Sequence, residues 1–340
     1  MTDVFHIKLR VWQNLLATLI NDYNIYAPLK NQEALDYQLI DKSHIPQIIY
    51  NVPKPISPLK LFFLPVKENV ALEVLSAPNI IIGSPACDLH ALDILDEIYL
   101  HEPFVDPFYR EKRENTILIG TDCHSILEHC HCTSYGIDPY PDKHHDLLLT
   151  VIEEDVFLER NSEKGDTVIE ILKNQTELRR ITESHQIDLL LKRQSIIDRL
   201  ADQNEQLPDY QQTGQLITQS NDAIWKKYAK TCVACGACAT ICPTCTCFLL
   251  VDRPGFEKIR QMDACQYPGF ARIAAGEDPL GQHFVRFRNR YLCKYVWKPE
   301  KFHSIACTGC GRCIETCIGN IDKNELFREL KRVKGKHKDT

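Results

Sequence analysis

The residues of this chain best suited to chemistry are cysteines, which form two runs in its carboxyl-terminal third. Each run has the spacing C-x2-C-x2-C-x3-C, which bacterial proteins use to bind [4Fe–4S] clusters. The first run consists of Cys232, Cys235, Cys238 and Cys242, and the second of Cys307, Cys310, Cys313 and Cys317. Three thiolates on one tight loop can hold three corners of a cubane, while the fourth points away from it. The spacing therefore predicts two [4Fe–4S] clusters.

The same spacing predicts which cysteines share a cluster, because the fourth cysteine of each run ligates the other cluster. The two predicted ligand sets are Cys232, Cys235, Cys238 and Cys317, and Cys307, Cys310, Cys313 and Cys242. Within the runs, Gly236, Gly309 and Gly311 allow the backbone to pass close to sulfur. Two all-cysteine zinc sites are the weaker alternative, since zinc rarely uses this run. Ile318 replaces the proline that usually follows the fourth cysteine.

Four more cysteines lie in the first half of the chain, namely Cys87, Cys123, Cys130 and Cys132. Their spacing is not a standard run, but four thiolates suffice for a third [4Fe–4S] cluster if the fold gathers them. Histidines crowd the same segment, at His124, His129 and His131. A zinc site with mixed ligands is therefore a competing interpretation, and unligated cysteines are another.

The other four of the 16 cysteines are not needed for these ligand sets. Cys245 and Cys247 follow the first run, where we expect them to pack beside a cluster or hydrogen-bond its sulfur. A redox-active thiol pair at these two positions is the alternative. Cys265 and Cys293 are predicted to be core cysteines.

Composition excludes several classes of protein. The chain has 340 residues, 44% hydrophobic and 25% charged, as in an ordinary globular protein of two domains. Its net charge of −6 argues against a nucleic-acid partner. The sequence shows no secretory signal and no apolar run of membrane-spanning length, so we expect a cytoplasmic protein whose cysteines bind metal. No G-x-G-x-x-G fingerprint or P-loop is present, which predicts no flavin or NAD on this chain.

The elements that must position the first-half cysteines are recognisable as short apolar runs bounded by turn residues. Buried strands are predicted over residues 79–83, 115–120 and 146–151. Helices are predicted over residues 9–19, 88–100 and 184–206. Cys87 thus falls between a strand and a helix. The Gln- and Asn-rich residues 202–221 are predicted to be a loop that contains the domain boundary.

The predicted fold class is α+β. A mixed α/β domain over residues 1–205, with the possible third cluster site, precedes a mainly helical ferredoxin-like domain over residues 222–334. Little strand signal is visible in the second half. Short helices are predicted over its cysteine runs and over residues 222–230, 268–275 and 323–333.

The arrangement of motifs resembles a known family, the dicluster iron–sulfur subunits of anaerobic sulfite reductases and of soluble, sulfhydrogenase-type NiFe hydrogenases. In the hydrogenases, the dicluster iron–sulfur subunit is the beta subunit. The likeness extends over most of the chain and includes three cysteine-bearing stretches and the basic segment 286–290. These stretches are Pro85-Ala-Cys87-Asp88, Asp122-Cys123 followed by Cys130-His-Cys132, and Cys242-Pro-Thr-Cys245-Thr-Cys247 with Ala264-Cys265. Departures from the family pattern include His131, where phenylalanine is usual, and Cys293, where histidine is common.

The resemblance implies a cytoplasmic, non-catalytic electron-transfer subunit. Its implied partners are a flavin-binding subunit that exchanges electrons with NAD(P)H and a catalytic reductase or hydrogenase subunit. The first-half cysteines recur in the family pattern, which favours a third cluster. Our hypothesis is therefore a relay of single electrons between these partners. The alternatives are a sulfur or disulfide reductase that uses Cys245 and Cys247, and a redox sensor whose clusters regulate a partner.

Overall fold

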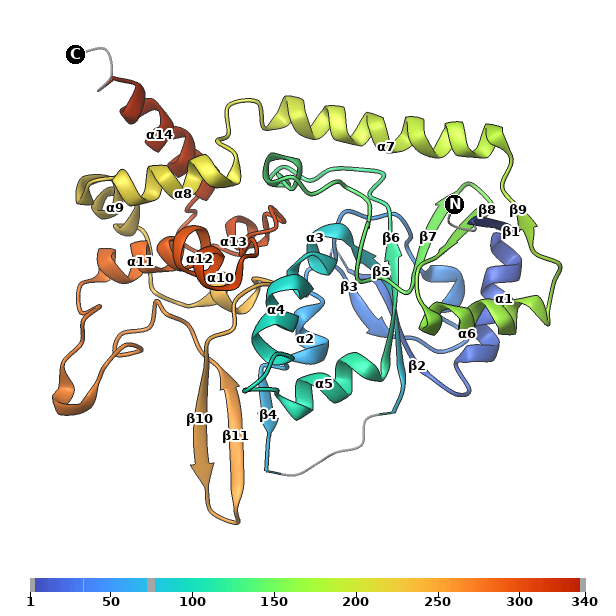
Figure 1. Ribbon diagram of the computed structural model, residues 1–340, viewed down its shortest axis with the longest axis horizontal. Helices are drawn as coiled ribbons and strands as arrows, with labels where there is room; N and C mark the ends of the chain where they lie inside the picture. Colours follow the sequence, from blue (N-terminus) through green and yellow to red (C-terminus); the bar gives the residue numbers. More distant parts are fainter. Residues whose placement is uncertain (1–3, 33, 72–76, 337–340) are drawn as a thin grey trace.

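The first half of the chain is built on an eight-stranded mixed sheet (Figure 1). The computed structural model describes residues 4–32, 34–71 and 77–336. The strand order is β3-β2-β5-β6-β7-β8-β1-β9, with β2, β5, β6 and β7 parallel and the other pairings antiparallel. The strands are β1 Val4–Lys8, β2 Asn24–Asn31, β3 Ala34–Leu39, β5 Asn79–Pro85, β6 Thr116–Thr121, β7 Leu147–Ile152, β8 Asp155–Arg160 and β9 Arg179–Arg180. The three predicted strands correspond to β5, β6 and β7.

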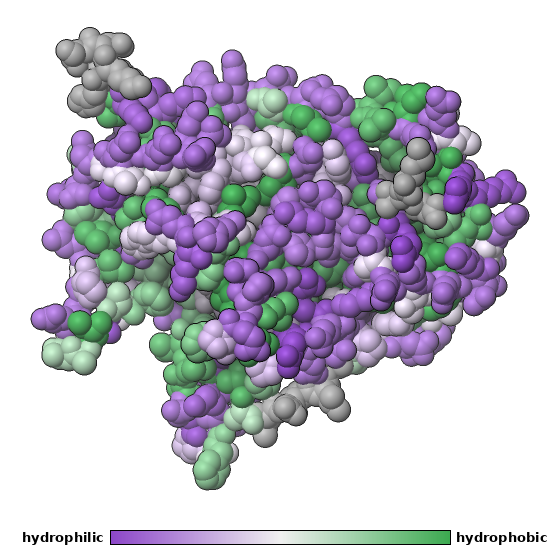
Figure 2. Space-filling model, in the orientation of Figure 1, coloured by the Kyte–Doolittle hydropathy of each residue, from purple (hydrophilic) through white to green (hydrophobic). Residues whose placement is uncertain are grey.

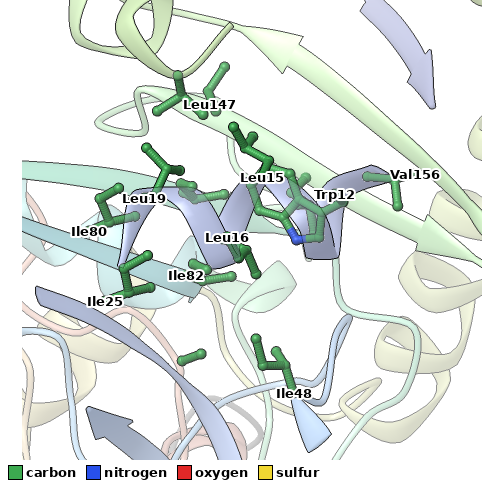
Figure 3. Packing of buried hydrophobic residues seen from close by; sticks show 14 of the residues in the cluster. Trp12, Leu15, Leu16, Leu19, Ile25, Ile48, Ile80, Ile82, Leu147 and Val156 are labelled. Carbon is green, nitrogen blue, oxygen red and sulfur yellow. The ribbon is translucent and has the colours of Figure 1, made fainter. Parts of the chain in front are cut away.

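Helices cover both faces of this sheet (Figure 1). On one face lie α1 (Leu9–Leu19) and α6 (Glu163–Lys173), and on the other α2 (Lys60–Phe63), α3 (Ala86–Leu89), α4 (Ala91–Tyr99) and α5 (Pro107–Glu114). Figure 3 shows Trp12 and Leu16 of α1 packed toward the strands. Along β5, Ile80 and Ile82 join this core, whereas Ile81 joins the core of the opposite face. The strand is buried on both sides, which explains its continuous apolar run.

A long helix, α7 (Glu183–Gln203), spans from the sheet to the second half of the chain (Figure 1). The following helical elements are α8 Tyr210–Gln219, α9 Asp222–Ala229, α10 Ala237–Thr240, α11 His283–Leu292, η4 Cys293–Trp297, α12 Lys298–Phe302, α13 Arg312–Glu315 and α14 Lys323–Lys336. Their shared core contains Trp225, Phe287 and Phe327. Short 3-10 turns occur at Ile45–Gln47, Thr133–Tyr135 and Ala274–Gly276. The helices predicted over residues 9–19, 184–206, 222–230 and 323–333 are present as α1, α7, α9 and α14.

The prediction of a mainly helical second half is not confirmed, because this half contains a long β-hairpin. Strands β10 (Phe248–Arg253) and β11 (Glu257–Met262) pair antiparallel, and β11 also pairs with β4 (Lys67–Asn69). The hairpin projects from the body of the protein (Figure 1), and apolar side chains reach the surface along it (Figure 2). Phe248, Leu249 and Leu250 are all exposed, so β10 lacks the alternation of apolar and polar residues that identifies a half-buried strand.

Two further expectations in the second half were wrong. The predicted loop over residues 202–221 contains α8, which begins after Asp209, whose carboxylate accepts a hydrogen bond from the backbone N–H of Gln212 at 2.7 Å. Leu216 and Ile217 on one side of α8 pack in the core that contains Trp225. The glutamines of α8 nevertheless make its sequence look like a linker. The predicted helix over residues 268–275 is a series of turns, since Gly269 and Ala275 have left-handed backbone angles. The division into domains 1–205 and 222–334 therefore remains a proposal.

Candidate iron–sulfur sites

The first cysteine run lines a cavity together with the last cysteine of the second run. Its lining includes Cys232, Cys235, Cys238, Cys313 and Cys317. Its empty volume, which includes the part open to solvent, is about 540 Å³. The predicted ligand set, including its member from the other run, is thus brought together, and Cys235 is exposed at the molecular surface.

The second run lines a neighbouring cavity with the last cysteine of the first run. Its lining includes Cys242, Cys307, Cys310 and Cys313, and its empty volume is about 360 Å³. The two cavities share Cys313, Arg290 and Lys323 as lining residues, so only a wall of side chains separates them. Short helices α10 and α13 follow the left-handed glycines Gly236 and Gly311, which turn the chain out of each loop.

The four first-half cysteines also surround one cavity, although they lie far apart in the sequence. Its lining includes Cys87, Cys123, Cys130 and Cys132, and its empty volume is about 370 Å³. Cys87 follows β5 and Cys123 follows β6. Because β5 and β6 are neighbouring parallel strands, their carboxyl ends deliver both cysteines to the same edge of the sheet. The other two cysteines come from the loop before the 3-10 turn Thr133–Tyr135.

Helix α7 covers this third cavity. Leu200 lines it, and Ile196 and Leu200 pack in one apolar cluster with Cys130. The Asn204 amide donates a hydrogen bond to the Cys130 carbonyl at 2.9 Å. Arg193 of α7 forms an ion pair with the buried carboxylate of Asp122, at 2.8 Å, beside Cys123. The buried residues Ile196 and Leu200 of α7 therefore cover a candidate metal centre.

The residues around the third cavity fit an iron–sulfur cluster. Its four cysteines converge on it from three segments of the chain. None of His124, His129 and His131 lines it. Instead, the Nε2 atom of His131 accepts a hydrogen bond from the Lys323 ammonium at 2.7 Å. Within residues 4–32, 34–71 and 77–336, no three His, Cys, Asp or Glu side chains are grouped as a single metal ion requires.

Buried cations surround the cavities and supply charge of the sign that thiolate-rich groups need. Burial would lower the pKa of Lys54, Arg290 and Lys294, but neighbouring cysteines raise the pKa of each, which keeps them cationic. Arg290 donates a hydrogen bond to the Cys238 carbonyl at 3.1 Å. Lys294 donates to the Thr244 hydroxyl at 2.7 Å, and that hydroxyl lies 3.3 Å from the Cys242 sulfur.

Sequence reasoning missed these cations. Lys54 comes from the first half of the chain, yet its ammonium donates to the Cys310 carbonyl and pairs with Glu315 at 2.7 Å. No spacing rule connects a lysine to a cysteine that lies far away in the sequence. Only Arg290 lies in a stretch that the family resemblance includes, the basic segment 286–290.

A buried ion pair joins the second run to the third site. Arg312, which lies between Cys310 and Cys313, makes two hydrogen bonds to the Asp88 carboxylate at 2.5 and 2.8 Å. The same guanidinium donates to the Pro55 carbonyl at 2.9 and 3.1 Å. Asp88 is the neighbour of Cys87 in sequence. The bidentate pair therefore fixes α13 against the end of β5.

The backbones of the two sites also touch. The carbonyl of Gly309 accepts a hydrogen bond from the His131 backbone N–H at 2.9 Å. A Cβ atom added to Gly309 would lie 2.6 Å from the backbone of Cys132, closer than real Cβ contacts allow. Only glycine fits this contact.

We expect Gly309→Ala to reduce the iron bound by the purified chain, because the backbone of Cys132 must move to admit a methyl group. Gly136→Ala is the matched control. Both glycines have left-handed φ angles, +68° and +72°, and share the backbone strain of about 1 kcal/mol that alanine brings there. An added Cβ at Gly136 meets nothing within 4 Å. Iron analysis of both variants should show a loss for Gly309→Ala alone. An equal loss of iron in both variants would mean that backbone strain, and not contact with Cys132, reduces iron binding.

The four remaining cysteines lie close to this region. The Cys245 side chain interacts with the sulfur of the predicted ligand Cys242, and this interaction and burial raise the pKa of Cys245. The Cys247 side chain interacts similarly with Cys265. Cys293 begins η4 and is partly exposed, so only Cys265 is a buried cysteine as predicted.

Part of the chain matches a known family of iron–sulfur domains. Residues 231–321 match the model of a 4Fe-4S dicluster domain. This range contains both cysteine runs and, apart from Lys323, the residues that line their cavities. The match supports a ferredoxin-like carboxyl-terminal part, as in an iron–sulfur electron-transfer protein.

One relative is similar to this chain over almost its whole length. The chain is 29% identical over 325 residues to Sulfhydrogenase 2 subunit beta of Pyrococcus furiosus, an alignment that covers 90% of this chain and 92% of the relative. The relative and the dicluster domain together support the family that the sequence resembles, the dicluster iron–sulfur electron-transfer subunits with the hydrogenase beta subunits among them. No helix in the described parts of the chain is long and apolar enough to cross a bilayer.

Proposed function

We propose that this chain relays single electrons through three [4Fe–4S] clusters. The observation that carries the proposal is the continuity of the three cavities. Cys310 lines both the third and the second cavity, and Cys313 lines both the second and the first. The first cavity opens toward the exposed residues Cys235 and Val233. The chain thus has a row of sites that runs from beneath α7 to the surface.

The protein's own residues would hold and insulate the clusters. The proposed ligand sets are Cys232, Cys235, Cys238 and Cys317; Cys307, Cys310, Cys313 and Cys242; and Cys87, Cys123, Cys130 and Cys132. When bound, each cluster supplies a reversible one-electron couple. Lys54, Arg290 and Lys294 would balance the negative charge, and α7 would exclude water from the third site.

We further propose that the chain works in the cytoplasm between two partners. One is a flavin-binding subunit that exchanges electrons with NAD(P)H, and the other is a catalytic reductase or hydrogenase subunit. Support comes from the family resemblance and from the name of the relative, which is a subunit of a sulfhydrogenase. A relay needs two docking surfaces, and the exposed side chains Val233 and Ile318 beside the first cavity offer one of them.

The test uses the chain purified alone under anaerobic conditions. Dithionite should bleach its visible sulfur-to-iron absorption and produce EPR signals from coupled cubanes, whereas NADH alone should do neither. The control is NADH with an added flavin-dependent NADH oxidoreductase, which should restore the bleaching. Sustained oxidation of NADH by the lone chain would contradict a pure relay. Lack of bleaching by dithionite would contradict any relay.

The alternative function is a thiol-based reductase of sulfur or disulfide bonds, for which Cys245 and Cys247 were the predicted pair. A different pairing is favoured, because the pKa of Cys245 responds to the predicted ligand Cys242 and the pKa of Cys247 responds to Cys265. This second pair is independent of the three predicted ligand sets.

A further inference from the structure

The base of the β10–β11 hairpin brings two cysteines together that no predicted ligand set uses. Phe248 pairs with Met262 in the hairpin, and the ladder extends one step further, because the backbone N–H of Asp263 donates to the Cys247 carbonyl at 3.0 Å. The chain then turns, and Cys265 arrives beside Cys247. The side chains of Cys247 and Cys265 interact, which lowers the pKa of Cys247 and raises the pKa of Cys265. Two cysteines at the base of one hairpin thus lie side by side.

The sulfurs of Cys247 and Cys265 differ in exposure to solvent and in the charges around them. Cys247 is partly exposed, whereas Cys265 is buried. Lys298 lies beside Cys247, since its ammonium donates to the Thr244 carbonyl at 2.8 Å and to the Thr246 hydroxyl at 3.0 Å. The interaction with Cys265 and the nearby lysines lower the pKa of Cys247 to about 6, against the effect of burial. The same interaction and burial raise the pKa of Cys265.

This asymmetry is what a dithiol needs for exchange with a disulfide. The accessible sulfur must be a thiolate to attack, and the second sulfur must be held close enough to displace the product. The hairpin holds Cys247 and Cys265 close together, and the Lys298 ammonium balances the charge of a Cys247 thiolate. Cys245, two residues before Cys247, links this pair to Cys242 of the second cavity through its own side-chain interaction.

We propose that Cys247 and Cys265 form a redox-active dithiol that reduces low-molecular-mass disulfides. The Cys247 thiolate attacks one sulfur of the substrate, the substrate S–S bond breaks, and the first thiolate leaves while a mixed disulfide forms on Cys247. Cys265 then loses its proton and attacks the Cys247 sulfur. The second substrate thiolate leaves, and a Cys247–Cys265 disulfide remains. The substrate gains two electrons and, in water, two protons. Return to the dithiol takes two electrons and two protons, and only this return rests on the proposed relay.

The test is a single turnover with 4,4′-dithiodipyridine, a chromogenic disulfide, added to the cluster-loaded chain under anaerobic conditions. No electron donor is present, so the result does not depend on the relay. We expect a fast phase that releases two thiopyridone equivalents per chain. Peptide mapping of the product should show Cys247 joined to Cys265. A fast phase that leaves both of these cysteines unmodified would overturn the proposal.

Single serine variants separate the two roles. Cys247→Ser should lose the fast phase. Cys265→Ser should release one equivalent in place of two and keep a mixed disulfide on Cys247. The matched control is Cys293→Ser, which removes another partly exposed cysteine and should keep both equivalents. Iron and acid-labile sulfide should be unchanged in all three variants. Loss of iron from Cys247→Ser or Cys265→Ser would overturn the proposal and assign these sulfurs to a metal site.

Discussion

Replacing Cys123 by serine should lower the iron content of the anaerobically purified chain from about twelve to about eight atoms, with an equal loss of acid-labile sulfide. Cys123 is one of the four cysteines that line the third cavity. Burial and the neighbouring cysteines raise the pKa of its thiol, so only a bound metal would keep it as a thiolate. A serine hydroxyl is a poor ligand for iron at this position, and a cubane that lacks one of four protein ligands is labile.

The structure indicates that the loss should stay within the third site. The Cys123 sulfur lies 3.9 and 3.5 Å from the carbonyl oxygens of Val52 and Pro53, and Cys123 lines neither of the other two cavities. The substitution therefore removes a proposed ligand of the third site alone. EPR of the dithionite-reduced variant should retain the signals of the two dicluster sites and lose the coupling that a third neighbouring cubane contributes.

Cys293→Ser is the control for loss of a cysteine as such, since Cys293 lines none of the three cavities. It should keep about twelve irons. If the unaltered chain holds about eight irons and one zinc, the third site binds zinc and the cluster assignment there is wrong. If Cys123→Ser keeps all of its iron, Cys123 is not a ligand.

The first half of the fold could be predicted from the sequence because its central strands are buried on both faces. Such strands appear as uninterrupted apolar runs, as in residues 79–83, and the parallel order then places Cys87 and Cys123 at one edge. The hairpin β10–β11 was missed for the opposite reason. Its apolar side chains Phe248, Leu249 and Leu250 face solvent, so no periodicity marked a buried face. The Pro254–Gly255 turn between its strands was the signal that could have revealed it.

The cysteine runs could be interpreted from sequence because their geometry is local. Spacing alone determines which three sulfurs share a loop. The third site is different, since its cysteines come from three segments and its wall includes Cys310 of the second run. Contacts such as Gly309 against Cys132, or Lys54 against Cys310, depend on how the two halves pack and leave no periodic trace.

We expect Arg312→Met to destabilise the protein by about 3–5 kcal/mol, the cost of removing one partner from a buried ion pair. The side chains of Arg312 and Asp88 are 1% and 0% exposed. Without the guanidinium, the Asp88 carboxylate keeps, among the described residues, only the hydrogen bond from the Leu59 backbone N–H at 3.2 Å, and the Pro55 carbonyl loses the Arg312 donor. Apparent unfolding midpoints in urea, taken from tryptophan fluorescence under anaerobic conditions, measure the effect.

A surface pair of the same chemistry provides the control. Arg328 and Glu325 of α14 pair at 2.7 Å, but their side chains are 22% and 50% exposed, so Arg328→Met should cost less than about 1 kcal/mol. The double variant Arg312→Met with Asp88→Asn removes both charges and should recover part of the loss, because no unpaired charge then remains buried. Equal effects of Arg312→Met and Arg328→Met would mean that the buried pair does not hold the two sites together. A large effect accompanied by iron loss would show that the ion pair, which lies between Cys87 and the second run, maintains the contact on which a continuous row of clusters depends.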